Sequence, residues 1–307
     1  MQASKLRDTR SLSLRMWLVL VICQTIWAGS YVAMLFASAE LPVGAVVTLR
    51  FGLASLLFLP LVLRLGLPQV ERRDWALILA LGALNFTISP SLQVASLRYT
   101  QAIDVSILVA LEPLMTVVLA ALVLHETLNP RTWAAGAMAL AGALALSGVG
   151  LPGAEITRER LLGNAMYIAA TLCEVSVTLA GGRLARRYDP LVAMGLLKTS
   201  GFLAAAVLYA GVWSEIDLSA ISTKAWASIV YLGAGASVFG YGVWYWALRE
   251  VPVSQAALTL FLQPIAGTVF GYLLAGERVG WNTVIGGVLI LSALAWQQAL
   301  SYRPRLD

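Results

Sequence analysis

Four polar side chains recur along one strongly apolar stretch of the chain. Tyr167, Thr171, Glu174 and Thr178 are spaced by four, three and four residues, which places them on one narrow face of a helix. A charged side chain costs about 2.5 kcal/mol or more at the centre of a bilayer, so we expect this face to meet water, a partner or a ligand. Glu174 would then bind an ammonium group or carry a proton; the structural alternative is an ion pair with a lysine such as Lys198.

Other apolar segments carry aromatic and polar side chains that suit an amphiphilic guest, since an aromatic ring offers a flat apolar surface with a polar tip. For Trp and Tyr, the alternative is an aromatic belt at the membrane interface. For the amides and hydroxyls, it is hydrogen bonding between helices. Together with the four residues above, the predicted substrate-binding residues are Gln24, Trp27, Tyr31, Asn85, Ser89, Tyr241, Trp244 and Tyr245.

Two prolines follow polar residues in matching sequence contexts. Glu112 precedes Pro113, and Gln263 precedes Pro264. A proline within a membrane helix frees a backbone carbonyl, which a ligand, water or a side chain then satisfies. These pairs are therefore predicted hinges or gates, with Glu112 either gaining and losing a proton or fixing the broken helix.

The composition excludes most soluble classes. Of 307 residues, 59% are hydrophobic and only 12% are charged, and the mean hydropathy is +0.80. The elements that position the candidate residues are therefore predicted to be membrane helices, and the lipid bilayer is the expected partner. The net charge of +5 lies in short loops and tails, so we expect no nucleic-acid partner.

Metal and cofactor chemistry finds little support in the sequence. Cys23 and Cys173 lie in apolar runs, and His125 is the single histidine. A zinc site needs several ligands, and no such spacing is present. We expect no metal, no cofactor and no catalytic residue, and so not an enzyme.

A membrane helix needs about 20 mostly apolar residues. The chain offers ten such segments joined by short loops, and a soluble helical bundle is excluded because too few polar faces remain to meet water. The predicted helices are 16–38, 43–64, 75–97, 101–124, 131–150, 161–182, 190–213, 225–248, 253–275 and 281–300.

The basic residues predict the orientation of these helices. Of the 21 Lys and Arg, fourteen lie in the tails and loops on the side of the amino terminus, five lie in the opposite loops, and two lie within helices. Basic loops favour the cytoplasm, so both termini are predicted to be cytoplasmic. The first apolar run ends in a sequence similar to a signal peptidase site, 37–39, but it is longer than a signal peptide's apolar region, and we expect no cleavage.

The chain also contains an internal repeat. A shift of 151 residues aligns Leu97 with Leu248 and Pro113 with Pro264, and the stretch around 97–136 then recurs without a gap. Each copy holds five predicted helices, an odd number, so the second copy must enter the bilayer from the opposite side. The predicted fold is an all-α membrane protein of ten transmembrane helices in two inverted five-helix repeats, residues 1–150 and 151–307.

Several of these features are similar to those of a known family. Pro113 and Pro264 in the fourth helix of each half, Glu126 and Glu277 at the ends of those helices, and the glycines of the fifth helices (Gly136, Gly142, Gly286 and Gly287) resemble the EamA branch of the drug/metabolite transporter superfamily. Trp27-Ala28-Gly29-Ser30 and Arg50-Phe51 also look like family features.

The resemblance implies a function and a place for the cargo. It implies a carrier in the bacterial inner membrane that exports small metabolites, and aromatic amino acid exporters of the YddG type are the suggested relatives. It also implies a central cavity lined by the first, third, fourth, sixth, eighth and ninth helices, with the fifth and tenth at the periphery.

Each half carries one basic residue inside its second helix. In the early part of the repeat the offset is 148, which aligns Arg50 with Lys198. A charge at this depth must reach the interface or find a partner. One interpretation is an anchor for a substrate carboxylate; the other, which the symmetric duplication favours, is a framework cation held by carbonyls or by a nearby acid.

The sequence therefore predicts a secondary transporter that exports small amphiphilic metabolites, aromatic or other amino acids above all, by alternating access and as a monomer. The alternative within transport is a carrier of lipid precursors or nucleotide sugars, which would need a strongly basic cavity for phosphate. An intramembrane enzyme is the alternative from another class, and it lacks a convincing nucleophile or metal cluster.

Overall fold

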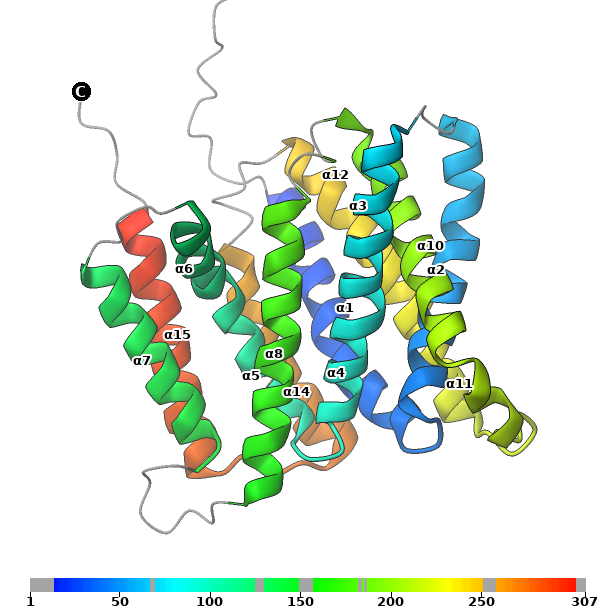
Figure 1. Cartoon of the computed structure of the whole chain (residues 1–307). Coiled ribbons are helices and arrows are strands. Elements are labelled where there is room, and N and C mark those ends of the chain that lie inside the picture. Colours follow the sequence, from blue (N-terminus) through cyan, green and yellow to red (C-terminus); the bar gives the residue numbers. More distant parts are fainter. Residues whose placement is uncertain are drawn as a thin grey trace, which may run out of the picture.

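The computed structural model describes residues 14–66, 70–124, 130–148, 157–181, 184, 187–250 and 258–301. Throughout these ranges the chain forms helices and connecting turns, with no strand (Figure 1). The all-helical class predicted from the sequence is therefore confirmed.

The described helices follow the apolar segments. In the first half they are α1 (Leu14–Ser38), α2 (Val43–Leu65), α3 (Arg72–Ala83), α4 (Ser89–Ser96), α5 (Ala102–Leu108), α6 (Glu112–Leu124) and α7 (Pro130–Leu146). In the second half they are α8 (Arg158–Ala180), α10 (Pro190–Leu208), α11 (Thr223–Val230), α12 (Tyr241–Glu250), α14 (Leu262–Ala275) and α15 (Trp281–Ser301).

Six stretches of the described residues are long and apolar enough to cross a membrane. Shorter apolar helices, Leu262–Ala275 and Trp281–Trp296, accompany them. α8 has 23 residues but carries charged residues at its start and the polar face of Tyr167, Thr171 and Glu174, which lowers its hydropathy. The six stretches are Arg15–Ser38, Val43–Leu65, Arg72–Ser96, Ala102–Val123, Leu191–Leu208 and Thr223–Trp244.

Two predicted helix ends are wrong. The helix predicted over 190–213 ends at Leu208, because Tyr209 leaves the helical region with φ −107° and ψ 21°, and a 3₁₀ segment, η3 (Ala210–Glu215), follows. The helix predicted over 131–150 ends at Leu146, two residues before Gly148, whose φ of 86° suits only glycine well. Hydropathy alone extended both helices, since the residues beyond these ends are also apolar.

Several membrane helices are not uniform, and the irregularities recur in both halves. α3 and α4 are joined by the π-helix η1 (Leu84–Ile88), and α11 and α12 by the π-helix η4 (Tyr231–Gly240). Short 3₁₀ segments, η2 (Val109–Leu111) and η5 (Leu258–Phe261), directly precede α6 and α14. Such departures from α-helical hydrogen bonding are frequent at functional sites.

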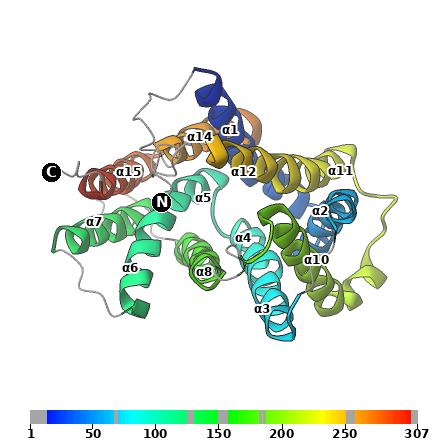
Figure 2. The same cartoon turned by 90° about the horizontal axis from the view of Figure 1, so that it is seen from above.

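The helices pack into one bundle in which α7 and α15 form an outlying pair (Figure 2). α1 packs along α14, which also contacts α5, and α4 packs along α8. α2 packs against α10 and η4, and α10 contacts α3 and η1. The predicted peripheral position of the fifth and tenth helices agrees with this arrangement.

The α7–α15 contact depends on two glycines that face each other. A Cβ atom on Gly286 would lie 2.7 Å from the carbonyl oxygen of Gly142, whereas one on Gly136 would meet nothing within 4 Å. Gly286→Ala is therefore expected to lower the free energy of unfolding by about 1–3 kcal/mol through overpacking. Gly136→Ala, the control, should raise it by up to about 1 kcal/mol through helix propensity. Thermal unfolding of both purified variants in detergent tests the difference, and equal midpoints would contradict it.

Candidate functional site

A buried chain of hydrogen bonds joins α1 to α14. The Tyr31 hydroxyl donates to the side-chain oxygen of Gln263 at 3.0 Å, and the Gln263 amide donates to Gln24 at 2.7 Å. The Gln24 amide in turn donates to the hydroxyl of Thr259 at 3.1 Å. Three of the predicted residues, Gln24, Tyr31 and Gln263, thus meet in one network, directly before Pro264. Through these contacts the predicted hinge residue Gln263 is tied to α1.

A second cluster joins α4 to α8 around Glu174. The Glu174 carboxylate accepts a hydrogen bond from the Gln93 amide at 2.7 Å and from the Ser89 hydroxyl at 3.1 Å. Ser89 is fully buried and Glu174 is half-buried. The polar face of α8 thus points toward another helix, as the spacing of its residues predicts. Thr171, on the same face, is buried and donates back to the carbonyl of Tyr167.

An aromatic cluster joins α1 to η4 and α12. The Trp27 ring lies 5.3 Å from that of Tyr241, edge to face, and 5.6 Å from that of Trp244. The indole N–H of Trp27 donates to the carbonyl of Ala236 in η4 at 3.2 Å. Pairs of this geometry contribute about 0.5–1.5 kcal/mol each beyond the area they bury. The cluster fixes the π-helical segment against α1.

The aromatic pair Tyr31–Tyr167 connects the first two clusters. Its ring centroids are 6.4 Å apart at 80°, and both rings are buried. Because Tyr31 and Trp27 share α1, that helix contacts all three clusters. Glu112 begins α6, which packs against α8, the helix that carries Glu174. The structure therefore brings most of the predicted substrate-binding residues to one region between α1, α4, α8, α12 and α14.

The two basic residues within the membrane helices have unlike surroundings. Arg50 donates to the Ser237 hydroxyl at 3.0 Å, whereas the Nζ of Lys198 is buried with no hydrogen-bond partner among the described residues. The predicted alternative of an ion pair between Glu174 and Lys198 is wrong, since the described contacts contain none. The acid is held by Ser89 and Gln93 instead.

The remaining predicted residues are placed as follows. Asn85 is half-buried in η1 and has no hydrogen bond among the described contacts. Thr178 and Tyr245 lie on α8 and α12, but their side chains fall outside the described residues, as do His125 and Glu126. Pro113 and Pro264 sit in the first turns of α6 and α14, directly after 3₁₀ segments. The helix does change its hydrogen-bonding pattern at both predicted hinges.

Sequence reasoning missed several participants. Gln93 lies one turn after Ser89 on the same helix, so its spacing could have revealed it. Thr259, Ser237 and the ring of Phe86 carried no such signal. Their partners lie 235, 187 and 112 residues away along the chain, respectively: Gln24, Arg50 and Lys198. Only the packing of the two halves brings these pairs together.

Polar groups also cluster at the end of the bundle where α5 and α8 begin. Arg160 contacts both carboxylate oxygens of Asp104, at 2.6 and 2.7 Å, and Asp104 also accepts from Thr100. The loop residue Glu277 accepts the backbone N–H groups of Ala102 and Ile103, which caps α5. Burial raises the pKa of Glu277, while these two hydrogen bonds oppose that shift.

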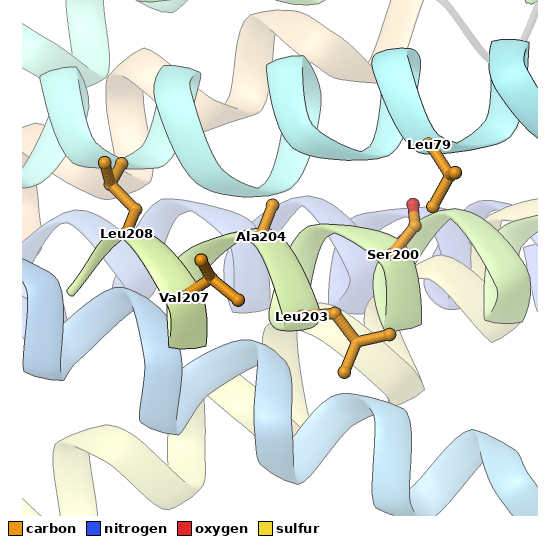
Figure 3. A pocket seen from close by; sticks show the side chains of 6 residues that line it. All are labelled: Leu79, Ser200, Leu203, Ala204, Val207 and Leu208. Carbon is orange, nitrogen blue, oxygen red and sulfur yellow. The ribbon is translucent and has the colours of Figure 1, made fainter. Parts of the chain in front are cut away.

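Two grooves mark the surface away from these clusters. One lies along α3 and α10 and is lined by Leu79, Ser200, Leu203, Ala204, Val207 and Leu208 (Figure 3). The other runs past Thr48, Gly52, Phe202 and Trp226, between α2, α10 and α11. Neither groove is lined by a predicted site residue. The four leucine and valine side chains of the first are exposed, as expected of a surface that faces lipid.

Among the described residues, no three His, Cys, Asp or Glu side chains gather as a metal site would require. The apolar helices define a multi-pass helical membrane protein, with polar and aromatic clusters packed between its helices. The sequence profile of the EamA-like transporter family matches residues 14–148 and 161–296. The chain belongs to this family, and the resemblance found in the sequence is confirmed.

Named relatives are transporters. An uncharacterized transporter of Archaeoglobus fulgidus is 26% identical over 280 residues, covering 90% of this chain and 95% of the relative. A probable terminal-alkyne amino-acid exporter of Streptantibioticus cattleyicolor is 24% identical over 286 residues, covering 91% of each. A solved crystal structure with 19% identity matches the fold at a TM-score of 0.62 over 93% of this chain and 97% of that one.

Proposed function

We propose that this transporter exports small amphiphilic metabolites, aromatic or other amino acids above all, by alternating access about a site inside the bundle. The observation that carries the proposal is the gathering of an aromatic cluster, a glutamate and a buried amide network between the halves. An aromatic ring pairs well with the Trp27 cluster, and an ammonium group with Glu174. The amino-acid exporter among the relatives supports the same class of cargo.

The inverted repeat of residues 1–150 and 151–307 is part of this proposal. In Figure 1 α1 descends from the upper end of the bundle, whereas α8, the first helix of the second half, ascends from the lower end. Contacts also recur when each helix is exchanged for its counterpart: α4 packs on α8, and α1 packs on η4 and α12. The π-helix η1 shifted by 148 residues falls within η4. Two antiparallel halves would allow one to rock against the other.

The orientation follows from the charged loops. We propose that both termini are cytoplasmic, in the inner membrane of a bacterial cell, and that the buried Asp104–Arg160 pair lies toward the outside. The proline positions would then serve as hinges, with Glu112 and Gln263 at matching places in the two halves. Proton coupling through Glu174 or Glu112 would require one of them to change its charge between states.

Counterflow into liposomes tests the export of amino acids. We expect the purified protein to exchange labelled phenylalanine, tyrosine or tryptophan, and Trp27→Ala to lower the initial rate by about tenfold, since a central aromatic contact is worth on the order of 1–3 kcal/mol. Trp281→Ala is the matched control, because Trp281 is 81% exposed at the start of α15. Trp27→Phe, which keeps a ring, should retain part of the rate.

The outcomes separate the parts of the proposal. If the folded protein exchanges other amino acids but not aromatic ones, the aromatic assignment is wrong. If it exchanges no amino acid, the cargo belongs to another class. Equal rates for Trp27→Ala and Trp281→Ala would remove the aromatic cluster from the site.

A further inference from the structure

Lys198 lies inside the bundle without a hydrogen-bond acceptor among the described residues. Its side chain is fully buried, and its Nζ lies 4.0 Å from the ring centroid of Tyr241, 4.2 Å from that of Phe86 and 5.6 Å from that of Phe51. In the part of the chain that the structure describes, no side chain or carbonyl accepts a hydrogen bond from Nζ. Aromatic faces enclose the cation where a framework lysine would have oxygen atoms.

Aromatic faces account for the position of this cation but leave its donors unused. A ring attracts a cation through its quadrupole. An ammonium group, however, has three N–H donors, and a buried donor without an acceptor is unfavourable. A framework lysine should instead donate to carbonyl or carboxylate oxygens, as the sequence-based interpretation requires. The site is therefore complete only with an added acceptor.

Arg50 supplies a second positive charge beside the ring of Phe51. Its guanidinium lies 5.0 Å from the centroid of Phe51, and it donates to the Ser237 hydroxyl and the Met34 sulfur. Arg50 and Lys198 both lie against the Phe51 ring, 5.0 and 5.6 Å from its centroid, so two like charges share this region. The described contacts place no carboxylate in an ion pair with Lys198. An anion between the two cations would relieve their repulsion.

Of the three rings around Nζ, that of Tyr241 is the least buried. Phe51 and Phe86 are buried, whereas the Tyr241 ring is only half-buried and packs against Trp27. Displacement of Tyr241 would expose Nζ toward the aromatic cluster. A cargo with an aromatic ring and a carboxylate can then place its ring against the aromatic cluster and its carboxylate at Nζ of Lys198.

We propose that Lys198 and Arg50, one from each half of the chain, form an anion subsite that binds the carboxylate of the cargo. The inference rests on the proposed function, because it assigns the acidic end of the amphiphile to this pair. α2 and α10, which carry the two residues, pack against each other. Both halves therefore hold the same group of the ligand.

The test uses two probes with the same ring and opposite charge. Dissociation constants of 3-phenylpropionate and 2-phenylethylamine are measured by calorimetry on the full chain in detergent. Lys198→Met is expected to weaken binding of the carboxylate by about tenfold, as loss of a charged hydrogen bond does, and to change binding of the amine by less than about twofold. Lys198→Arg should keep carboxylate binding within about threefold, because it restores the charge and the donors.

The matched control is Lys224→Met. Lys224 also lies over an aromatic ring, 3.3 Å from the centroid of Phe36, but it is exposed at the start of α11. Its replacement should leave both dissociation constants unchanged. Retained amine binding by Lys198→Met shows that this variant is folded.

Three results would overturn the anion subsite. They are carboxylate binding by Lys198→Met equal to that of the wild type, an equal loss of both probes, and no binding of 3-phenylpropionate by the wild type. Counterflow of amino acids in liposomes is scored separately. Carboxylate binding that needs Lys198, without any exchange of amino acids, would support the subsite and refute the export of amino acids.

Discussion

Arg160→Met is expected to lower the free energy of unfolding by about 3–5 kcal/mol, the usual effect of removing one partner of a buried ion pair. Asp104 is fully buried, and the two nitrogens of Arg160 that bond it lie at 2.6 and 2.7 Å. Methionine fills a similar volume but leaves the carboxylate charged and enclosed. Thermal and denaturant unfolding of the purified variants in detergent measures the loss.

Two further variants separate the charge from the packing. Arg158 lies two residues before Arg160 and its side chain is exposed. Arg158→Met should therefore change the free energy of unfolding by less than about 0.5 kcal/mol. Adding Asp104→Asn to Arg160→Met should restore much of the stability, because the buried charge is then absent. A double variant as unstable as Arg160→Met alone would show that packing, and not the buried charge, causes the loss.

The second large effect is expected at the amide network between α1 and α14. Gln263→Leu leaves the Gln24 oxygen and the Tyr31 hydroxyl buried without these partners. An unsatisfied buried polar group costs about 1–3 kcal/mol, so the variant should lose about 2–5 kcal/mol of unfolding free energy. Thermal unfolding in detergent again provides the measurement.

Thr268→Val is the control for Gln263→Leu. Thr268 lies about one turn along the same helix, and its hydroxyl donates only to the Pro264 carbonyl among the described contacts. Its replacement should lower stability by less than about 1 kcal/mol. If the two variants are equally stable, the network contributes little to holding α14 on α1.

The structural features that were predicted correctly are those whose physical signal lies within a short stretch of the sequence. The face of Tyr167, Thr171 and Glu174 was predicted from spacings within α8, since helical periodicity is a local property. The π-helices η1 and η4 were not predicted, because an inserted residue leaves the apolar pattern of a long segment almost unchanged. Hydropathy likewise extended α7 and α10 beyond their ends, where glycine or a change of backbone angles stops the helix.

The sequence named residues of the candidate site, but it did not predict which residues they contact. Gln24, Trp27 and Tyr31 were predicted as substrate-binding residues, and the structure gives each a different partner: Thr259, Ala236 and Gln263. For Glu174 the sequence offered Lys198 as a partner, and the structure provides Ser89 and Gln93. Which helices meet depends on packing over the whole bundle, which local periodicity does not encode.

The sequence by itself determined the class of the protein, the apolar helices and the duplicated pattern, because hydropathy and repeat spacing act over short or fixed intervals along the chain. Only the tertiary structure decided that Arg50 and Lys198, equivalent in sequence, differ in their surroundings. Arg50 bonds Ser237, whereas Lys198 lies against the rings of Tyr241, Phe86 and Phe51, with no acceptor among the described residues. The physical reason is that a buried charge takes its partners from other helices, whose faces are brought to it by packing alone.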